Sequence, residues 1–386
     1  AGTLSTYVGG QLVASLVNVG DTATTMAAAV VAAAALNTEL PMTVTASGGV
    51  LTWTSKHKGL SGNSVDLRMN FYGLPNGEIL PAGVTVAISD ANNGTADPDL
   101  SGLDAILGDV AYDFVGCGFT GSAAVASIKA LMATRWSSVR QVFGHAWMSV
   151  VQSEASLVTF GGTNNDPHTD IFGYYDSPTP PWEATAQILA AAAPALKADP
   201  ARPVQTLQLQ GFMAPPPASR FNASQKQTLL TNGIALLSHD NAGNTAILRA
   251  ITTYQDNAFG QPDQSYLDCE TLYTLMAITR QLSAMVTQKF PRSKVADDGT
   301  PFGAGQPIVT PKILKAELVA EYATMETNGL VEDADAMAAA TIVVRNLLNP
   351  GRLDVLFCPY LIQGLRVVAI KNQFRLFSAL AAAAAA

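Results

Sequence analysis

The chain has 386 residues, of which 48% are hydrophobic and only 13% are charged, and its net charge is −8. This charged fraction is about half of the roughly 25% usual in soluble domains, which fits a surface largely buried against other subunits and equally fits an enzyme rich in small residues. The negative charge is not offset by any stretch dense in Lys and Arg, which argues against nucleic acid as a direct partner. The length allows two or three domains.

The sequence also argues against membrane insertion and against a disulfide framework. The longest apolar run, Met26–Leu36 (MAAAVVAAAAL), is shorter than the roughly 20 residues of a spanning helix and predicts a buried helix instead. We expect no signal peptide. Cys117, Cys269 and Cys358 lie far apart and form no CxxC pair, which disfavours disulfides and zinc sites and favours a reducing, cytoplasmic site of synthesis.

Residues 1–97 are predicted to form a small α+β domain. A strand is expected within Val8–Val19, followed by a helix over Thr22–Leu36 that Asp21 would cap. Turn residues such as Gly and Asn-Gly then separate several short β-rich runs. These later strands are expected at Met42–Ala46, Leu51–Ser55, Ser64–Tyr72 and Val84–Ser89.

Residues 98–260 are predicted to form an α/β domain, because strands alternate with helices and this order indicates a largely parallel sheet covered by helices. The Pro-rich runs Ser177–Pro181 and Pro215–Pro217 are typical of connectors. The expected strands are Tyr112–Cys117, Val139–Phe143, Thr206–Leu209, Ile234–Leu237 and Ala246–Thr253, and the expected helices are Ser122–Thr134, Ser149–Ser156 and Ala223–Asn232.

Residues 261–376 are predicted to form a third, α+β domain. A long helix is expected over Tyr266–Gln288, where apolar residues recur with helical spacing. A second helix is expected to begin at Pro311, a residue favoured in the first turn, with Thr310 as its cap. Residues 377–386, which end in six alanines, are expected to be a tail outside the fold.

Two strands are predicted to end this third domain, Arg352–Phe357 and Leu365–Phe374, after the turn Asn349-Pro350-Gly351. The last strand is apolar on both faces, so it needs cover on both sides, and at a chain end it is a candidate for pairing with a neighbouring copy. Gly351, Pro359 and Gly364 are the expected hinge or linker positions. The predicted inter-subunit strand residues are Leu365, Val367, Val368, Ile370, Phe374 and Leu376.

A serine hydrolase is the first enzymatic possibility for an α/β domain. Ser122 opens a predicted helix after a strand, His145 follows a strand and Asp113 lies within one, which supplies the three residue types of a catalytic triad. However, the second Gly of a GxSxG nucleophile elbow is missing, and Ser is a common helix cap. We therefore interpret Ser122 as a cap and predict no catalytic residues.

Metal and nucleotide sites have little support. Asn165–Asp170 carries two carboxylates and an imidazole, but its residues are equally those of a structural turn. Asp297-Asp298-Gly299 lacks the rest of a calcium loop, and the Gly pairs at Gly116–Gly118 and Gly303–Gly305 complete no phosphate-binding motif. An exposed Asp66–Arg68 pair would contribute at most about 1 kcal/mol, although across a subunit boundary it could set register. No metal and no cofactor are predicted.

Several segments, taken in order over almost the whole chain, resemble the tail sheath proteins of contractile-tailed bacteriophages, in the Mu-like branch. No single motif is decisive, and the ordered set carries the resemblance. The matching stretches are Lys58–Arg68 (KGLSGNSVDLR), Leu107–Asp109 with Tyr112–Asp113, Ser177–Trp182 (SPTPPW), Asp199–Leu207 (DPARPVQTL), Ile251–Gln255 (ITTYQ), Ser265–Asp268 (SYLD), Phe290–Thr300 (FPRSKVADDGT), Ile308–Leu318 (IVTPKILKAEL), and Arg352–Leu356 with Gln373–Leu376.

The resemblance implies a multidomain α/β and α+β fold. It implies a subtilisin-like α/β middle domain without catalytic residues at 98–260, a small protruding α+β domain at 1–97, and a C-terminal sheath domain at 261–376. That last domain would end in an extended strand arm that pairs with a neighbouring subunit. The N-terminal part that such proteins carry is expected to be missing from this sequence. Cys358-Pro359-Tyr360 departs from the polar turn that the family has there.

The function implied is that of a structural, non-enzymatic subunit that polymerises helically, as stacked hexameric rings, around a tail tube. Contraction of this sheath would drive the tube through the host envelope. The implied partners are copies of itself, the tail tube protein, and the baseplate and tail terminator proteins, with no direct contact to nucleic acid and no membrane insertion. The implied location is the virion tail, after assembly in the host cytoplasm. The alternatives are the sheath of a phage-related contractile injection or secretion system, or an α/β serine hydrolase.

Overall fold

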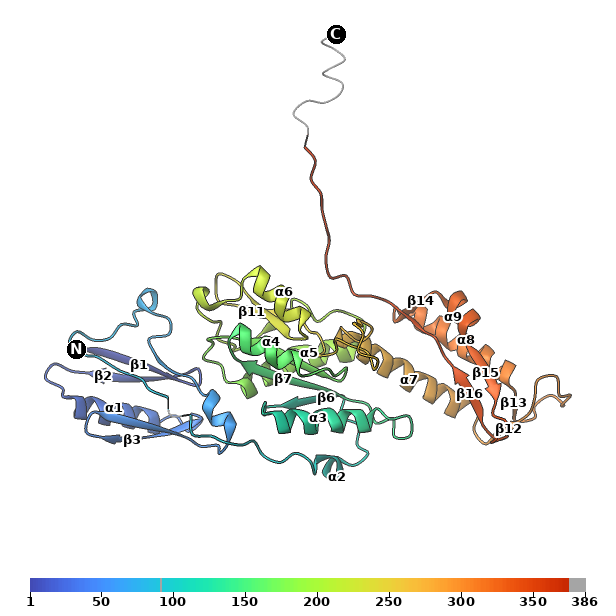
Figure 1. Cartoon of the computed structure of the whole chain (residues 1–386), viewed down its shortest axis with the longest axis horizontal. Helices are drawn as coiled ribbons and strands as arrows, with labels where there is room; N and C mark the ends of the chain where they lie inside the picture. Colours follow the sequence, from blue (N-terminus) through green and yellow to red (C-terminus); the bar gives the residue numbers. More distant parts are fainter. Residues whose placement is uncertain (91, 375–386) are drawn as a thin grey trace, which may run out of the picture.

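A computed structural model describes residues 1–90 and 92–374. Three packed regions follow one another along the long axis of the molecule, in chain order (Figure 1). Each region has hydrophobic clusters of its own. The chain is therefore a mixed α/β multidomain protein, as the sequence predicts.

The first region is built on a hairpin where a single strand was expected within Val8–Val19. Its turn, Gly9-Gly10, has positive φ angles of 55° and 81°, which only glycine adopts readily, and such a turn matches the twist of the two strands. A helix packs on the second strand and encloses a small core. The elements are β1 (Gly2–Val8), β2 (Gln11–Val17), α1 (Ala23–Ala35), β3 (Met42–Ser47), β4 (Val50–Ser55) and β5 (Leu67–Met69), with short 3₁₀ turns at Leu60–Ser64 and Leu74–Asn76.

Two expectations for this region were wrong in detail. Thr22, not Asp21, is the N-cap of α1, because its hydroxyl accepts a hydrogen bond from the backbone N–H of Thr25. Asp21 instead accepts a hydrogen bond from the hydroxyl of Thr25. Residues 84–89 do not form a strand.

The middle region contains a six-stranded sheet with the order β6-β7-β8-β10-β11-β9. The first four strands are parallel, and β11 runs antiparallel to both of its neighbours, β10 and β9, which confirms the largely parallel sheet. The strands are β6 (Phe114–Cys117), β7 (His145–Val151), β8 (Thr169–Tyr174), β9 (Gln208–Leu209), β10 (Ala235–His239) and β11 (Thr245–Arg249). The helices are α2 (Leu103–Leu107), α3 (Ser122–Arg135), α4 (Glu154–Gly162), α5 (Pro181–Ala198) and α6 (Ala223–Thr231), with a 3₁₀ turn at Pro217–Ser219.

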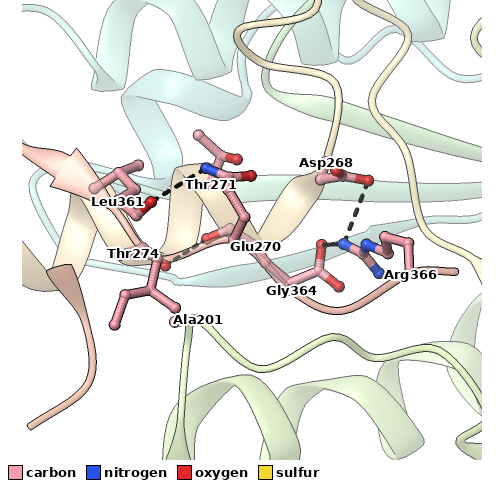
Figure 2. Close-up of a pocket in the computed structure, with 10 residues that line it drawn as sticks. Ala201, Asp268, Glu270, Thr271, Thr274, Leu361, Gly364 and Arg366 are labelled. Atoms are coloured by element: carbon pink, nitrogen blue, oxygen red, sulfur yellow. Dashed lines mark hydrogen bonds and ion pairs between the residues drawn. The ribbon is translucent and has the colours of Figure 1, made fainter. Parts of the chain in front are cut away.

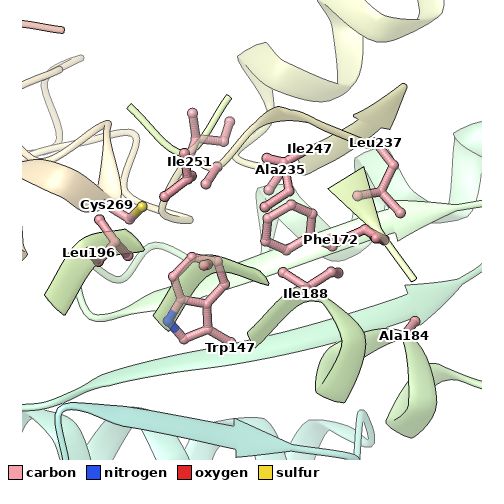
Figure 3. Close-up of a cluster of buried hydrophobic side chains, with 14 of the residues drawn as sticks. Trp147, Phe172, Ala184, Ile188, Leu196, Ala235, Leu237, Ile247, Ile251 and Cys269 are labelled. Carbon is pink, nitrogen blue, oxygen red and sulfur yellow. The ribbon is translucent and has the colours of Figure 1, made fainter. Parts of the chain in front are cut away.

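Helices cover both faces of this sheet. On one face Trp147 and Phe172 pack with α5, and Figure 3 shows their rings beside Ile188. On the other face Met148 and Ile171 pack with α3, α4 and α6. Strands β7 and β8 are thus buried on both sides, which is the usual state of a parallel strand and explains their nearly continuous apolar sequences.

The sequence prediction misplaced part of this region. The strand expected at residues 139–143 begins instead at His145, and the helix expected at residues 149–156 begins at Glu154. Strand β8 was not predicted, and its first two residues fell in the Asn165–Asp170 loop; α5 was not predicted either. Helix α5 begins at Pro181, the residue that was taken to end a connector.

The third region is attached to the second by one long helix, α7 (Cys269–Lys289). Its first turns, with Cys269 and Tyr273, lie in the core of the middle region, and its last turns, with Met285, lie in a core of the third. Thr310 caps α8, as predicted, by accepting a hydrogen bond from the N–H of Ile313. The other elements are β12 (Lys294–Val295), β13 (Ile308–Val309), α8 (Pro311–Thr327), β14 (Val331–Glu332), α9 (Ala334–Ala340), β15 (Ile342–Arg345), β16 (Leu353–Leu356) and β17 (Tyr360–Leu361).

Two half-buried histidines make folding of the middle region sensitive to acid. Burial lowers the pKa of His168, which stacks on Trp136, to about 3, and it lowers the pKa of His239 to about 4. Both values lie below the unfolded value near 6.5, so below that pH the unfolded chain binds more protons than the folded one. Stability is therefore fully present above pH 6.5 and falls as the pH drops towards 4.

We expect the urea concentration at the midpoint of unfolding to decrease when the pH is lowered from 7 to 5. The free energy of unfolding should decrease by at most about 1.4 kcal/mol per pH unit for each histidine. Replacing His168 by Asn should flatten the profile. An equal slope in the His168 variant and the native protein would contradict this explanation.

Candidate functional site: the C-terminal arm

The residues of the possible serine hydrolase are not brought together. Because β6 and β7 are parallel and Phe114 pairs with His145, His145 and Asp113 lie at the beginning of these strands, whereas Ser122 follows their end. His145 is fully buried and its Nε2 lies 2.9 Å from Oδ1 of Asp170. Asp113 pairs with Arg280. The geometry therefore does not form a catalytic triad from these three residues.

The cap assigned to Ser122 was also wrong. The N-cap of α3 is Gly121, and Ser122 is the exposed first residue of the helix. The backbone N–H of Gly121 donates instead to the carboxylate of Asp97, at 2.6 Å. The Asp97 carboxylate thus binds the N-cap residue itself, and α3 has no side-chain cap.

The carboxylates of the possible metal loops are occupied by protein groups. Asp166 accepts a hydrogen bond from the hydroxyl of Thr169, and Asp170 contacts His145. Asp297 pairs with Arg345, and Asp298 accepts from the N–H of Lys312 at the start of α8. Across residues 1–90 and 92–374 there is no group of three or more His, Cys, Asp or Glu side chains placed to hold a metal ion. Nor does this part of the chain contain a helix long and apolar enough to cross a bilayer.

The Asp66–Arg68 pair joins two regions of the molecule. The guanidinium of Arg68 contacts Asp66 within the first region and Asp176 in the middle region, the latter at 2.9 Å. Its side chain is only 20% exposed. The pair is therefore part of an intramolecular junction and not the isolated surface pair that was expected.

The most unusual feature of the structure is the segment of residues 363–374, which we call the arm. It leaves the third region as an extended chain that projects away from the rest of the molecule (Figure 1). It forms no strand with the described part of its own chain. Its large apolar side chains are exposed: Leu365 76%, Val367 79%, Val368 66%, Ile370 76% and Phe374 84%.

The composition of the arm is unusual for a segment that is exposed to water. Five large apolar side chains in one short segment exceed the scattered exposure that is ordinary on a soluble surface. Each would contribute about 1.5–3 kcal/mol if it were buried. The expected strand residue Leu376 lies outside the described residues.

The base of the arm is fixed to its own subunit. β17 pairs with β14 in an antiparallel manner, and the hydroxyl of Tyr322 donates to the carbonyl of Glu332 and accepts from the N–H of Tyr360. Of the expected hinge positions, Pro359 lies just before β17 and Gly351 lies in the turn between β15 and β16. The structure gives the static position of these residues, and their role as hinges stays a prediction.

A second anchor lies within the arm, at Arg366. The guanidinium of Arg366 lies 2.8 Å from Oε2 of Glu270 and 3.3 Å from Oδ1 of Asp268, at the N-terminus of α7 (Figure 2). Glu270 is only 4% exposed. Sequence reasoning missed this contact, because 96 positions separate Arg366 from Glu270 and no local pattern links them.

A possible acceptor for a strand lies in the same region. β15 and β16 form a two-stranded sheet with no further strand in the described chain. Val343 and Leu353 on the inner face pack against the core beneath α8. The outer face carries Ile342, Val344 and Leu356, which are 50–57% exposed. This hairpin therefore has two unpaired edges and an apolar outer face.

Comparison with known proteins gives these features a context. The description "Phage tail sheath protein central domain" matches residues 91–253, and "Phage tail sheath C-terminal domain" matches residues 261–375. The Mu-like prophage FluMu tail sheath protein of Haemophilus influenzae is 35% identical over 374 residues, which are 97% of this chain and 76% of that protein. The chain therefore belongs to the phage tail sheath protein family, in its Mu-like branch, and is a structural subunit of a contractile tail sheath.

One solved structure agrees in fold at much lower identity. A chain of the anti-feeding prophage baseplate has a TM-score of 0.51 at 11% identity, over 73% of this chain and 75% of that one. A sheath tail protein from Desulfitobacterium hafniense has a TM-score of 0.46 at 13% identity, over 82% of this chain and 71% of that one. The first likeness shows the fold alone, and the second is reported without argument.

Proposed function

We propose that copies of this chain polymerise helically, as stacked hexameric rings, around a tail tube, and that contraction of this sheath drives the tube through the host envelope. The observation that carries the proposal is the apolar arm, which projects away from its own subunit (Figure 1), together with a hairpin of the same region that has unpaired edges. A helical polymer needs contacts in which one patch meets a different patch on the next copy, and an arm with a distant acceptor has that property.

We propose further that the arm of one subunit, with Leu365, Val367, Val368, Ile370, Phe374 and Leu376 as its strand residues, adds to the β15–β16 sheet of the next. Strand addition supplies backbone hydrogen bonds with little demand on sequence. The apolar residues of the arm would cover the outer face of the hairpin, where Ile342 and Leu356 are exposed. Both surfaces would then lose water in the same contact.

The three regions would divide the work. Residues 1–97 would form a protruding domain, residues 98–260 the subtilisin-like, non-enzymatic body, and residues 261–376 the sheath domain with its arm, followed by the tail 377–386. The parallel sheet covered on both faces, and the separation of Ser122 from His145, support this assignment for the body. The tube, baseplate and terminator proteins would be the further partners, with assembly in the host cytoplasm.

Contraction would be a change between two packings of the same folded subunits, with the extended state held by a kinetic barrier. Each additional 100 Å² of apolar surface buried per subunit would release about 2.5 kcal/mol. Summed over many copies, this is enough to do mechanical work without nucleotide hydrolysis. Strand ladders would allow subunits to rotate without separating, since the linkers near Gly351 and Pro359 and the segment that follows Gly364 could bend.

Electron microscopy of the purified chain tests the proposal. We expect hollow, helically ordered tubes at concentrations where a monomeric enzyme would remain dispersed. A protein that stays monomeric at all concentrations, and that a serine-directed reagent labels at Ser122, would contradict the sheath function and favour a hydrolase. Sheaths of phage tails and of related injection systems would look alike, and the neighbouring genes distinguish them.

A further inference from the structure

Arg366 is the last residue that anchors the arm. Within the described chain, the final hydrogen bond between the arm and the body is the one from Arg366 to Glu270. Residues before it are held by β17 and by the bond from the N–H of Ile362 to the carbonyl of Leu330. Residues 367–374 are exposed and unpaired in the described structure. The segment thus has a fixed root and a free strand.

The anchor joins the arm to two parts of the molecule. One carboxylate oxygen of Glu270 accepts from the backbone N–H of Val204 at 2.9 Å, and the other accepts from Arg366 at 2.8 Å. Glu270 lies in the first turn of α7, where the helix dipole favours a negative charge. The arm is therefore tied both to α7 and to the loop before β9, which belong to the middle region.

Close packing next to the anchor leaves little freedom for the root. The backbone at Gly364 passes so near to Pro203 that a Cβ at position 364 would lie 2.3 Å from its Cγ. Only glycine allows this approach. Gly364 is restrained by the contact with Pro203 on one side and by the Arg366 anchor on the other (Figure 2 shows Gly364 and Arg366). The first backbone torsions of the arm that are free to rotate therefore lie after Arg366.

We infer that Arg366 is a positioning residue that fixes where the free strand begins and in which direction it leaves the subunit, and so selects the copy that receives it. The inference rests on the proposed strand exchange. Without the anchor, the free tether would start near Ile362 instead of Val367. A longer tether lowers the effective concentration of the strand at its acceptor and widens the range of directions. With the anchor in place, the backbone bends during contraction between Arg366 and Val367, and not at Gly364.

A distance measurement within one subunit tests this inference directly. Spin labels at Val368→Cys and at Ala323→Cys on the exposed side of α8, in a Cys358→Ser background, report the direction of the arm in dilute, unassembled protein. The double variant Arg366→Met/Glu270→Gln removes both charges, so that no lone charge is left buried. We expect its distance distribution to broaden clearly and its critical concentration for assembly to rise at least tenfold.

Control variants separate the anchor from general effects. Lys371→Met removes a positive charge from the exposed free strand without touching the anchor, and it should leave the distance distribution unchanged. Arg366→Lys keeps the charge and should restore part of the narrow distribution. If the double variant does not fold, Glu270→Gln alone, in which Arg366 keeps Asp268 and Val204 keeps an acceptor, should give intermediate broadening.

An unchanged distance distribution in the double variant, or in Glu270→Gln where that variant is used, would overturn the inference. Failure of the proposed function would look different. If a chain ending at Arg366 still formed normal sheaths, strand exchange would be refuted, whereas the distance measured within a single subunit would still decide whether Arg366 directs the arm.

Discussion

Removal of residues 367–386 is expected to abolish helical polymerisation and to leave a folded monomer. The truncation takes away the free strand, including Val367, Val368, Ile370 and Phe374, whose side chains contact nothing that the monomer needs. In the polymer the strand would supply several backbone hydrogen bonds at about 1 kcal/mol each and the burial of side chains at about 1.5–3 kcal/mol each. A loss of that size removes assembly at any practical concentration. Sedimentation velocity and electron microscopy measure the outcome.

The end point of the truncation is important. A deletion that begins at Leu365 also removes Arg366 and leaves the buried Glu270 without its guanidinium, which would destabilise the monomer itself. A chain ending at Arg366 avoids this effect, so its melting temperature should match that of the full chain. Removal of residues 377–386 alone is the matched control and should permit assembly. Normal sheaths from the chain ending at Arg366 would contradict strand exchange.

Local sequence signals located most elements whose boundaries depend on local chemistry. Thr310 with Pro311 fixes the start of α8, and the strand at β6 followed by the helix α3 was recognised from its pattern. The hairpin of β1 and β2 was missed although Gly9-Gly10, between two apolar runs, is a recognisable turn signal. The error there came from starting the strand at the turn instead of before it.

Buried strands were predicted less well, for a physical reason. β7 and β8 are covered on both faces, so they lack the alternation that identifies a half-exposed strand. β8 also begins at Thr169, directly after residues that are typical of turns. Here tertiary burial, which the sequence does not display locally, outweighed the turn signal.

The candidate site was likewise only partly predictable from the sequence. The apolar composition and terminal position of the arm could be read from the sequence, because both are local properties. Its anchor could not, because Arg366 and Glu270 are brought together only by the docking of α7 on the middle region. The exposed outer face of β15 and β16 was also not predicted, since it depends on which face α8 covers.

The hairpin offers a test of where the arm binds, because its hydrogen-bond pattern identifies the outward N–H groups. Asn346 donates to the carbonyl of Arg352 across the end of the hairpin. In an antiparallel ladder, residue pairs that are hydrogen-bonded to each other alternate with pairs that are not. Counting from Asn346–Arg352, the pairs Val344–Asp354 and Ile342–Leu356 are hydrogen-bonded between the two strands. The N–H groups of Val343 and Val355 therefore point to the two outer edges of the sheet, where an added strand would accept them.

We expect Val355→Pro, at the β16 edge, or Val343→Pro, at the β15 edge, to weaken assembly without opening the hairpin. Proline removes one outward donor and is tolerated on edge strands, and the unsatisfied acceptor that it leaves on the arm costs about 1–3 kcal/mol. This corresponds to a rise in critical concentration of about 5-fold to 150-fold, measured by sedimentation of the polymer. The Thr variants at the same positions keep the N–H and should assemble normally. If both Pro variants fold and assemble like the native chain, the β15–β16 hairpin is not the acceptor, and the arm must pair with another part of the neighbouring subunit.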